Sequence, residues 1–503
     1  RAGVFCGWFA AAFYTLVAGA GIPALRTFFM LTVGVAAMLT GRRITPFRIL
    51  LLALVVVLLF DPWAGMSPGF WLSFMAVGLL LWAALAVQGG DERQDRLFKR
   101  IGHWVHGFGR TQWAVTIGTL PVLLMFFSQF SLISPLTNAL AIPWVSGVVT
   151  PLTILALIIP WDGLLLLADG LLSPLMQMLV WSASLPIAVW YAPAPSPTVF
   201  ALAMLGALWW LMPIGWPGRW LAFFLCLPLI WPKSNQIPLG EARVEVLDVG
   251  QGLAVLIRTH AHVLLYDTGP YYSGTADAGD RVIVPYLRAT GVKHLDGMIV
   301  THRDTDHSGG AISVLESMPV AWVADAPDTA FGTLVPGIDQ KSCLAGTAWE
   351  WDGVHFEFLH PVAGNTPAKD DSNSQSCVLR VTAGNRSMLL TSDIEAPDEA
   401  GLMGRGLEKS DVLLVPHHGS GTSSTPMFLK AVKPEVAIVP VGYRNRYRHP
   451  KPEVISAYEA RKIKLYRTDS GGMIQVDLPA MTVKAYRESR RRYWMDQPGG
   501  AAE

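Results

Sequence analysis

The stretch Gly297–Gly310, GMIVTHRDTDHSGG, places four potential metal ligands directly after a short apolar run. The run indicates a buried strand, and the ligands follow within six residues: His302, Asp304, Asp306 and His307. His302 and Asp304 project to one side of an extended segment. Asp306 and His307 follow at a turn and can face a second position. This pattern predicts a site for two divalent cations close together, as in two-metal hydrolases.

Two later apolar runs also end in potential ligands. The segment SMLLTSD ends at Asp393, and DVLLVPHHGS carries His417 and His418 just past its apolar part. Active-site residues of layered α/β folds collect at such strand ends. Asp393 can bridge two cations, one histidine completes the site and the other can orient it, and the spacing does not distinguish the two. The predicted metal ligands are His302, Asp304, Asp306, His307, Asp393, His417 and His418, with Asp306 and His307 as the catalytic residues.

Other residues are expected to support this site. Asp248 and Asp267 end earlier apolar runs, and they are predicted to hold loops or to support the ligands, with a direct metal role as the alternative. The segment NRYRHPK, residues 445–451, is a local basic patch in an acidic half of the chain. Near the metals it would hold phosphates, and the alternative is a solvated basic loop. The predicted substrate contacts are Arg446, Arg448, His449 and Ser420.

The residues around these motifs indicate an α/β domain over 243–480. Apolar runs typical of strands are separated by turns, and helical stretches stand between several of them, such as Arg281–Thr290 and Pro452–Lys462. Strands mixed with helices over about 240 residues fit a layered fold, with sheets covered by helices.

The first 232 residues have a different composition. They contain 17 of the 77 charged residues and 15 of the 19 tryptophans, and their net charge is +5 against −4 for the remainder. This composition excludes a disordered, collagen-like or disulfide-scaffold protein, and the chain has no overall basic character of the kind that nucleic-acid binders show. About seven to nine membrane spans are expected, in apolar runs at 4–20, 24–39, 46–61, 67–88, 113–131, 136–160, 164–188, 196–213 and 218–231.

Charged residues indicate the topology of this membrane domain. Basic clusters at 42–48 and 93–110 flank the spans 46–61 and 67–88, so they lie on one side, which the positive-inside bias makes cytoplasmic. Five full spans after residue 113 would place residue 233 outside the cytoplasm. Arg26 lies within an apolar run, and it is either a functional residue of the membrane pathway or a snorkelling residue near a helix end.

The boundaries of the two domains follow from composition. Residues 233–242 are polar and proline-rich and indicate a linker, and residues 481–503 are basic and are expected to be a disordered tail. Cys343 and Cys377 can pair if this domain lies outside the cytoplasm. The chain begins at Arg1 inside an apolar run, and we expect that sequence is missing upstream.

Both halves resemble known families. The segments AGAGIPALRTFFM, DPWAGMSPGFWLSF and SPLTNALAIPW look like the competence domain of the ComEC DNA-internalisation family. The segments DVGQG, YDTG, THRDTDHSGG and VPHHGSGTSS resemble the metallo-β-lactamase superfamily, over residues 243–477. The superfamily pattern is HxHxDH, whose second histidine is Asp304 here, and no clean match is found for a further histidine that the superfamily often has.

The resemblance implies a polytopic helical membrane domain followed by an αββα domain of the metallo-β-lactamase fold. It implies a DNA-uptake channel of natural transformation in the inner membrane, with DNA, membrane lipid and other competence proteins as partners. The second domain would be periplasmic, a metal-dependent phosphodiesterase or nuclease that degrades the strand not transported. A carboxylate in place of imidazole shifts the metal preference toward Mn²⁺ or Mg²⁺, with Zn²⁺ as the alternative.

Two further hypotheses are compatible with the same residues. One is a membrane-tethered metallohydrolase that acts on a small phosphodiester or an envelope substrate. Its weakness is that one or two spans would suffice as an anchor. The other keeps the channel but makes the second domain a non-catalytic DNA clamp, which the complete set of ligands disfavours.

Overall fold

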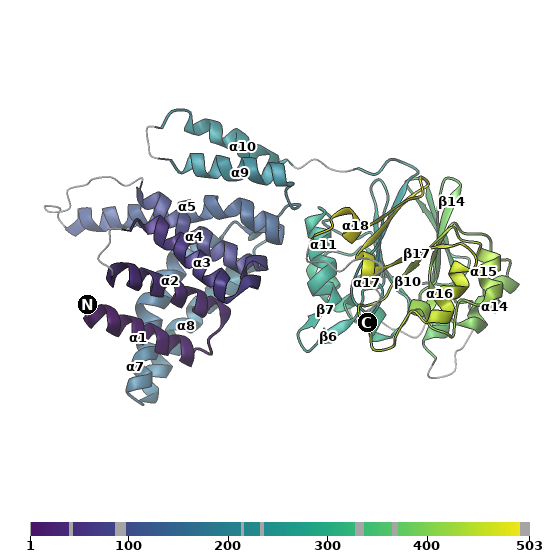
Figure 1. Ribbon diagram of the computed structural model, residues 1–503, viewed down its shortest axis with the longest axis horizontal. Helices are drawn as coiled ribbons and strands as arrows, with labels where there is room; N and C mark the ends of the chain where they lie inside the picture. The colour runs from purple at the N-terminus through teal and green to yellow at the C-terminus, as the bar shows by residue number, and fades with distance from the viewer. Residues whose placement is uncertain are drawn as a thin grey trace. The chain divides into compact units, whose positions relative to one another are not determined.

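A computed structural model describes residues 2–39, 44–85, 97–212, 216–231, 236–326, 337–364 and 371–492. The chain divides into two compact units, Arg1–Lys233 and Ser234–Glu503 (Figure 1). The first unit is helical and the second contains mixed β-sheets with helices. The predicted combination of a helical domain and an α/β domain is confirmed, and each unit is described by itself below.

Helices make up nearly all of the described first unit. Proline stands at the first turn of α3, α4 and α9, where its missing N–H leaves no hydrogen bond unmade. A short antiparallel pair, β1 (Gln129–Ser131) and β2 (Val189–Tyr191), joins two connecting segments. The helices are α1 (Ala2–Val17), α2 (Ile22–Leu39), α3 (Pro46–Phe60), α4 (Pro68–Leu85), α5 (Leu97–Phe127), α6 (Ser134–Trp144), α7 (Thr150–Ile158), α8 (Asp162–Ala183), α9 (Pro197–Trp210) and α10 (Ala222–Ile230).

The surfaces of these helices are apolar. Large side chains such as Leu59, Leu157 and Trp181 are more than half exposed. A water-soluble bundle turns such residues inward, whereas a bundle in lipid exposes them at little cost. Among the described residues, two helices are long and apolar enough to cross a membrane, Ser134–Ile158 and Asp162–Ala183, and six shorter apolar helices accompany them. The expected seven to nine spans therefore stay a prediction.

The basic clusters used for topology fall partly outside the described residues. Arg42, Arg43, Arg93 and Arg96 are not described, nor are the side chains of Lys99 and Arg100. Arg26 is described, and its guanidinium is buried within the helical unit against Gly69 at the start of α4, in the segment SPGFW.

Beside a two-stranded pair, β6 (Tyr271–Ser273) with β7 (Ala276–Asp277), two large sheets form the second unit. One has the strand order β10-β9-β8-β5-β4-β3-β18-β19, and the other runs from β11 through β17 in chain order. The first contains β3 (Ala242–Val246), β4 (Val255–Arg258), β5 (Val263–Tyr266), β8 (Gly297–Val300), β9 (Trp322–Asp325), β10 (Asp339–Ser342), β18 (Ile474–Leu478) and β19 (Thr482–Ala485). The second contains β11 (Ala348–Trp351), β12 (Val354–His360), β13 (Val378–Ala383), β14 (Arg386–Leu390), β15 (Val412–Leu414), β16 (Val436–Val439) and β17 (Lys464–Arg467).

The sheets face each other across a shared core. Side chains of both sheets form it, among them Val244, Tyr266 and Phe356, which are fully or almost fully buried. Helices α11 (Val284–Ala289) and α13 (Ala311–Ser317) cover the outer face of the first sheet. Helices α14 (Ala396–Gly404), α15 (Pro426–Val432) and α16 (Pro452–Glu459) cover the outer face of the second (Figure 1). This arrangement confirms the predicted αββα layering.

The central strands are buried on both faces. Every residue of β8 and β16 is buried, and the sequences GMIV and VAIV are continuous apolar runs for that reason. Strand β8 pairs in parallel with β5 and β9, and β15 pairs in parallel with β14 and β16. Parallel strands end at the same edge of a sheet, so the predicted ligand segments after β8, β14 and β15 start from such edges.

The tail prediction is wrong for residues 481–492. Strand β19 pairs with β18 at the edge of the first sheet, and Ala485 is buried in the shared core. Arg487 of the short helix α18 (Tyr486–Ser489) places its guanidinium nitrogen 2.8 Å from Asp248 Oδ2. The basic composition misled the prediction because Arg487 is paired with an acid rather than solvated. Residues 493–503 lie outside the described residues.

Part of the predicted linker is bonded to the second unit. The Gly240 N–H donates to the Asp352 carbonyl at 2.7 Å, and Ile237 is buried. Residues 232–235 lie outside the described residues.

Candidate metal centre

The turn after β8 is held by its backbone. The Thr301 N–H and hydroxyl donate to the two carboxylate oxygens of Asp267, at 2.8 and 2.9 Å. The Asp306 carbonyl accepts from the Leu253 N–H at 3.0 Å, and a Cβ on Gly252 would overlap that carbonyl oxygen. Gly252, the second glycine of the DVGQG segment, is therefore required for the close approach of this segment to the turn with Asp306. Helix α12 (Thr305–Ser308) starts immediately after Asp304.

His307 is fixed from behind. Its Nδ1 lies 2.8 Å from Asp267 Oδ2, and both side chains are fully buried. The carboxylate accepts the Nδ1 proton, so the lone pair of the neutral ring is on Nε2, which points to the other ligand candidates. This contact gives Asp267 the supporting role that the sequence indicated, behind His307.

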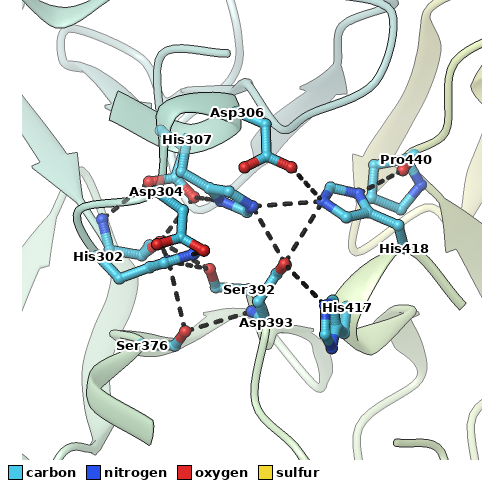
Figure 2. Close-up of polar contacts among 12 residues, drawn as sticks. His302, Asp304, Asp306, His307, Ser376, Ser392, Asp393, His417, His418 and Pro440 are labelled. Atoms are coloured by element: carbon cyan, nitrogen blue, oxygen red, sulfur yellow. Dashed lines mark hydrogen bonds and ion pairs between the residues drawn. The ribbon is translucent and has the colours of Figure 1, made fainter. Parts of the chain in front are cut away.

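The second sheet supplies the opposite side of the site. Asp393 follows β14, with Oδ1 3.2 Å from His307 Nε2 and Oδ2 3.5 Å from His418 Nε2 (Figure 2). His418 follows β15, and its Nδ1 lies 2.7 Å from the Pro440 carbonyl oxygen, so its Nε2 also carries the lone pair. Ser392, His417 and His418 all have positive φ angles near 50°. Non-glycine residues in this region of backbone conformation concentrate at functional sites.

Four potential ligand atoms converge, two imidazole nitrogens and two carboxylate oxygens. His307 Nε2 and His418 Nε2 lie 3.3 Å apart, and Asp306 Oδ2 lies 3.4 Å from His418 Nε2. Burial opposes the charge of both imidazoles, but the neighbouring carboxylates, Asp393 first among them, raise the pKa of His307 and of His418. A divalent cation would replace the protons between these imidazoles and carboxylates, so these residues fit a divalent metal.

His302 offers a second, separate position. Its ring is fully buried, its Nε2 has no hydrogen-bond partner within the described part of the chain, and this atom lies 3.9 Å from Asp304 Oδ2. An unpaired buried nitrogen is costly unless it binds a ligand. Its ring centroid is 4.2 Å from that of His307, which places the two positions side by side. The candidate ligands here are His302, Asp304 and Asp393.

The electrostatics of the cluster keep its ligands available. Burial opposes the charge of Asp306, yet the hydrogen bond from His418 and the charge of His307 lower its pKa to about 2. Burial and then the neighbouring His307 lower the pKa of His302 to about 4. Burial also opposes the charge of Asp393, but His307 and His418 hold its pKa well below the usual value. At neutral pH the site therefore presents carboxylates and a neutral His302 imidazole.

The structure distinguishes the two neighbouring histidines. His418 is 2% exposed and points at Asp306 and Asp393, whereas His417 is 22% exposed and its Nε2 lies 3.8 Å from Asp393 Oδ2. The His417 Nδ1 faces Glu395 Oε1 at 3.2 Å. His418 thus belongs to the cluster geometrically, and His417 lies at its rim.

The predicted substrate residues lie at different distances from the cluster. His449 contacts His417 edge to face, with 6.1 Å between ring centroids. Ser420 follows the two histidines, and its hydroxyl contacts Thr422. Arg446 and Arg448 are exposed in the loop that precedes His449. Arg26 belongs to the other unit.

Known families match both units. Residues 1–217 match the Competence protein family, and residues 247–443 match the metallo-β-lactamase superfamily. The chain is 38% identical over 491 residues to the competence protein ComA of Neisseria gonorrhoeae, over 97% of this chain and 67% of that protein. The chain belongs to the competence protein family. The predicted resemblance, and the order of the two domains, are confirmed.

Other members of the family are more distant. Uncharacterized protein YcaI of Escherichia coli is 30% identical over 501 residues, covering 97% of this chain and 63% of that protein. ComE operon protein 3 of Bacillus subtilis is 27% identical over 500 residues, covering 92% of this chain and 62% of that protein. The chain spans about two thirds of the length of these relatives.

One histidine of the superfamily pattern has no match in this sequence. The superfamily often has a histidine between its metal motif and the bridging aspartate. Here the Ser372 hydroxyl donates to Asp304 Oδ1 at 2.6 Å, so a serine approaches the His302 position. His360, in the same stretch, directs its Nε2 at the Ser374 carbonyl oxygen, 2.9 Å away.

Several residues of the site escaped the sequence analysis. Ser376 and Ser392 place hydroxyls 3.5 Å from His302 Nδ1, and Thr301 does so at 3.0 Å. Glu395 holds His417. Isolated serines and threonines carry no sequence signal for such roles, although Ser376 and Ser392 do lie within two residues of strand ends.

Proposed function

We propose that this protein takes part in DNA uptake during natural transformation and that its second unit hydrolyses phosphodiester bonds in DNA. The helical unit would carry one strand across the inner membrane, and the second unit would degrade the other. Membership of the competence protein family supports the first part. The observation that carries the second part is the convergence of His307, His418, Asp306 and Asp393 beside His302 and Asp304.

The ligand set supports two divalent ions. Asp306, His307, His418 and Asp393 would hold one, and His302, Asp304 and Asp393 the other. Two bound ions would generate a hydroxide-like nucleophile and neutralise the attacking and leaving oxygens. The second position has more oxygen than nitrogen donors, which favours Mn²⁺ or Mg²⁺ and leaves Zn²⁺ as the alternative.

Other residues of the second unit would orient the metal ligands or contact the substrate. Asp267 and the Pro440 carbonyl orient the rings of His307 and His418, so that both Nε2 atoms face the same point. Arg446 and Arg448 carry charges that suit phosphate oxygens, and the Ser420 hydroxyl and His449 lie beside the rim histidine.

The location of the second unit follows from the same proposal. Incoming duplex DNA arrives from outside the cytoplasm, so a domain that degrades one strand would be periplasmic. A disulfide joins Cys343 and Cys377, both fully buried, and structural disulfides persist outside the cytoplasm but are rare within it. Alkaline phosphatase fused at residue 240 would be active if this placement is right, and a cytoplasm-only fluorescent reporter there would stay dark.

Cleavage of strand-labelled DNA tests the proposal directly. The full chain in detergent, with Mn²⁺ or Mg²⁺, is expected to degrade a duplex labelled on either strand. Asp306→Asn should lower the rate about 10³-fold or more, because a ligand of the nucleophile is lost. Asp339→Asn, on the exposed edge strand β10, is the matched control. An absence of cleavage with any divalent ion, or wild-type rates in Asp306→Asn, would refute the nuclease role.

DNA entry into cells tests the transport role separately. In a transformable bacterium whose own competence protein is deleted, this chain should restore uptake of labelled DNA. Uptake by the Asp306→Asn chain would show that transport does not need hydrolysis. Failure of the unaltered, membrane-inserted chain to restore any uptake would contradict the transport role.

A further inference from the structure

The loop that follows β16, residues 440–451, is bonded at both of its ends to the segment that carries His418. Pro440, where it begins, accepts from His418 (Figure 2), and the Lys451 N–H donates to the Gly419 carbonyl at 2.9 Å. A Cβ on Gly442 would lie 2.5 Å from the Gln251 N, and one on Gly419 would lie 2.5 Å from Pro450 Cβ. The loop is therefore wedged between the segment with His417 and His418 and the segment with Gln251.

The loop also has a fixed internal structure. The Asn445 side-chain amide donates to the His449 carbonyl at 2.7 Å and to the Gly442 carbonyl at 3.1 Å. Its amide oxygen accepts from the His449 N–H at 2.9 Å. Asn445 thus closes the loop on itself, which holds the side chains between positions 443 and 451 in place before any ligand binds.

Cations and aromatic rings alternate along this loop. Tyr443 and Tyr447 are 57% and 46% exposed. The guanidinium of Arg444 lies over the Tyr443 ring, 5.2 Å from its centroid. That of Arg446 lies over the Tyr447 ring, 4.8 Å from its centroid. Within the part of the chain that the structure describes, no carboxylate lies within 4.0 Å of the four cations of the loop, Arg444, Arg446, Arg448 and Lys451. Their charges are available to an external anion.

The rings lead from the loop to the metal cluster. Tyr447 stacks on His449 with 5.8 Å between centroids and 30° between planes. The His449 ring contacts the His417 ring, with 6.1 Å between centroids. The centroids of the His417 and His418 rings are 6.5 Å apart. A continuous series of rings therefore connects an exposed tyrosine to a candidate metal ligand.

We propose that the loop Tyr443–Lys451 binds a single, unpaired nucleic-acid strand next to the metal cluster, with bases stacked on its tyrosines and phosphates on its arginines. The proposal rests on the proposed function and specifies which form of the substrate the site holds. Exposed rings interleaved with cations that have no carboxylate partner among the described residues suit an unpaired strand, because every base offers an aromatic face. In a duplex these faces are covered by neighbouring base pairs, so only separated or terminal bases can stack on Tyr443 and Tyr447.

Binding measured without cleavage tests this inference. The full chain in detergent with EDTA is titrated into a labelled single-stranded oligonucleotide, a blunt duplex and a fully abasic oligonucleotide of equal length, with fluorescence anisotropy as the readout. Tyr443→Ala and Tyr447→Ala should each weaken single-strand binding roughly fivefold or more. Tyr447→Phe keeps the ring and loses only the hydroxyl that accepts from Arg446, so it should bind the single strand more tightly than Tyr447→Ala does. The alanine variants should bind the abasic strand as the wild type does.

The arginines provide a second, independent measurement. Arg446→Ala and Arg448→Ala should weaken binding of normal and abasic strands alike. Each should reduce the slope of log affinity against log salt by about 0.7, the value for one phosphate contact of a single strand. Thermal unfolding of each variant verifies that the second unit stays folded.

Failure of this inference differs from failure of the nuclease proposal. If DNA is not cleaved but Tyr447→Ala loses single-strand binding selectively, the loop assignment stands and the nuclease role falls. If DNA is cleaved while Tyr443→Ala and Tyr447→Ala bind the single strand as the wild type, the loop assignment is wrong. Equal losses on normal and abasic strands would also overturn it, because no base would then be stacked.

Discussion

Asp267 holds His307 in position, with 2.8 Å between Asp267 Oδ2 and His307 Nδ1 and no solvent exposure on either side chain. The same carboxylate accepts two hydrogen bonds from Thr301, at the start of the metal-motif turn. One acid therefore fixes both the backbone of the turn and the orientation of a ligand that the turn carries. Partners of this kind raise the basicity of a metal-binding histidine.

Asp267→Asn tests that relationship. The amide is nearly isosteric but uncharged, so the fold should persist while affinity for Mn²⁺ falls about 10- to 100-fold. Isothermal titration calorimetry on the full chain measures the affinity. Asp477→Asn, a surface partner of Arg243, is the control and should leave the affinity unchanged. Wild-type affinity in Asp267→Asn would show that the contact does not support a metal ligand.

Ser372→His should change the metal preference. The new imidazole would join His302 and Asp304 and make their position richer in nitrogen, which favours Zn²⁺ over Mn²⁺. Elemental analysis after dialysis against an equimolar mixture of the two ions should show an increased zinc content. Ser374→His, two residues away, should keep the wild-type ratio. An unchanged ratio in Ser372→His would indicate that Ser372 does not border a metal position.

Alanine at the two neighbouring histidines should separate their roles. His418→Ala removes a buried ligand candidate, and the metal content should fall by one ion per chain. His417→Ala removes a side chain at the rim, and the metal content should stay as in the wild type. Elemental analysis measures both. Loss of an ion in His417→Ala alone would reverse the assignment.

Removal of the disulfide should destabilise the second unit. The bond closes a separation of 34 residues in sequence, for which loop entropy predicts about 3–4 kcal/mol. Cys343→Ser with Cys377→Ser should therefore lower the denaturation midpoint of this unit, followed by tryptophan fluorescence. Replacement of the free Cys226 in the other unit is the control. If both cysteines react with a thiol reagent in the unfolded, unreduced chain, the bond is absent.

Deletion of residues 481–503 should destabilise the second unit as well. The deletion removes β19, the buried Ala485 and the ion pair of Arg487 with Asp248, and it exposes the edge of β18. Thermal unfolding should occur several degrees lower than in the wild type. A chain that ends at Arg492 keeps all these contacts and should match the wild type. Equal stability of the shorter chain would show that the tail adds nothing to the sheet.

The sequence alone predicted a helical domain followed by a layered α/β domain, and it selected most of the residues that converge in the second unit. These features depend on local patterns. Lipid and water require different compositions, buried parallel strands need apolar runs, and metals need His and Asp just past the ends of strands. Four ligand-type residues within the six positions 302–307, just past GMIV, are a local signal, so His302 and Asp306 could be recognised without coordinates.

Only the tertiary structure separated His418 from His417, brought Ser372 to Asp304 and paired Arg487 with Asp248. Each of these relationships joins segments 68 or more residues apart, or depends on which way a turn points its side chains. A serine has the same sequence signature in any loop, and adjacent histidines differ only in φ, ψ and neighbours. The basic tail looked disordered because composition does not reveal that Arg487 pairs with Asp248, in the loop that follows β3.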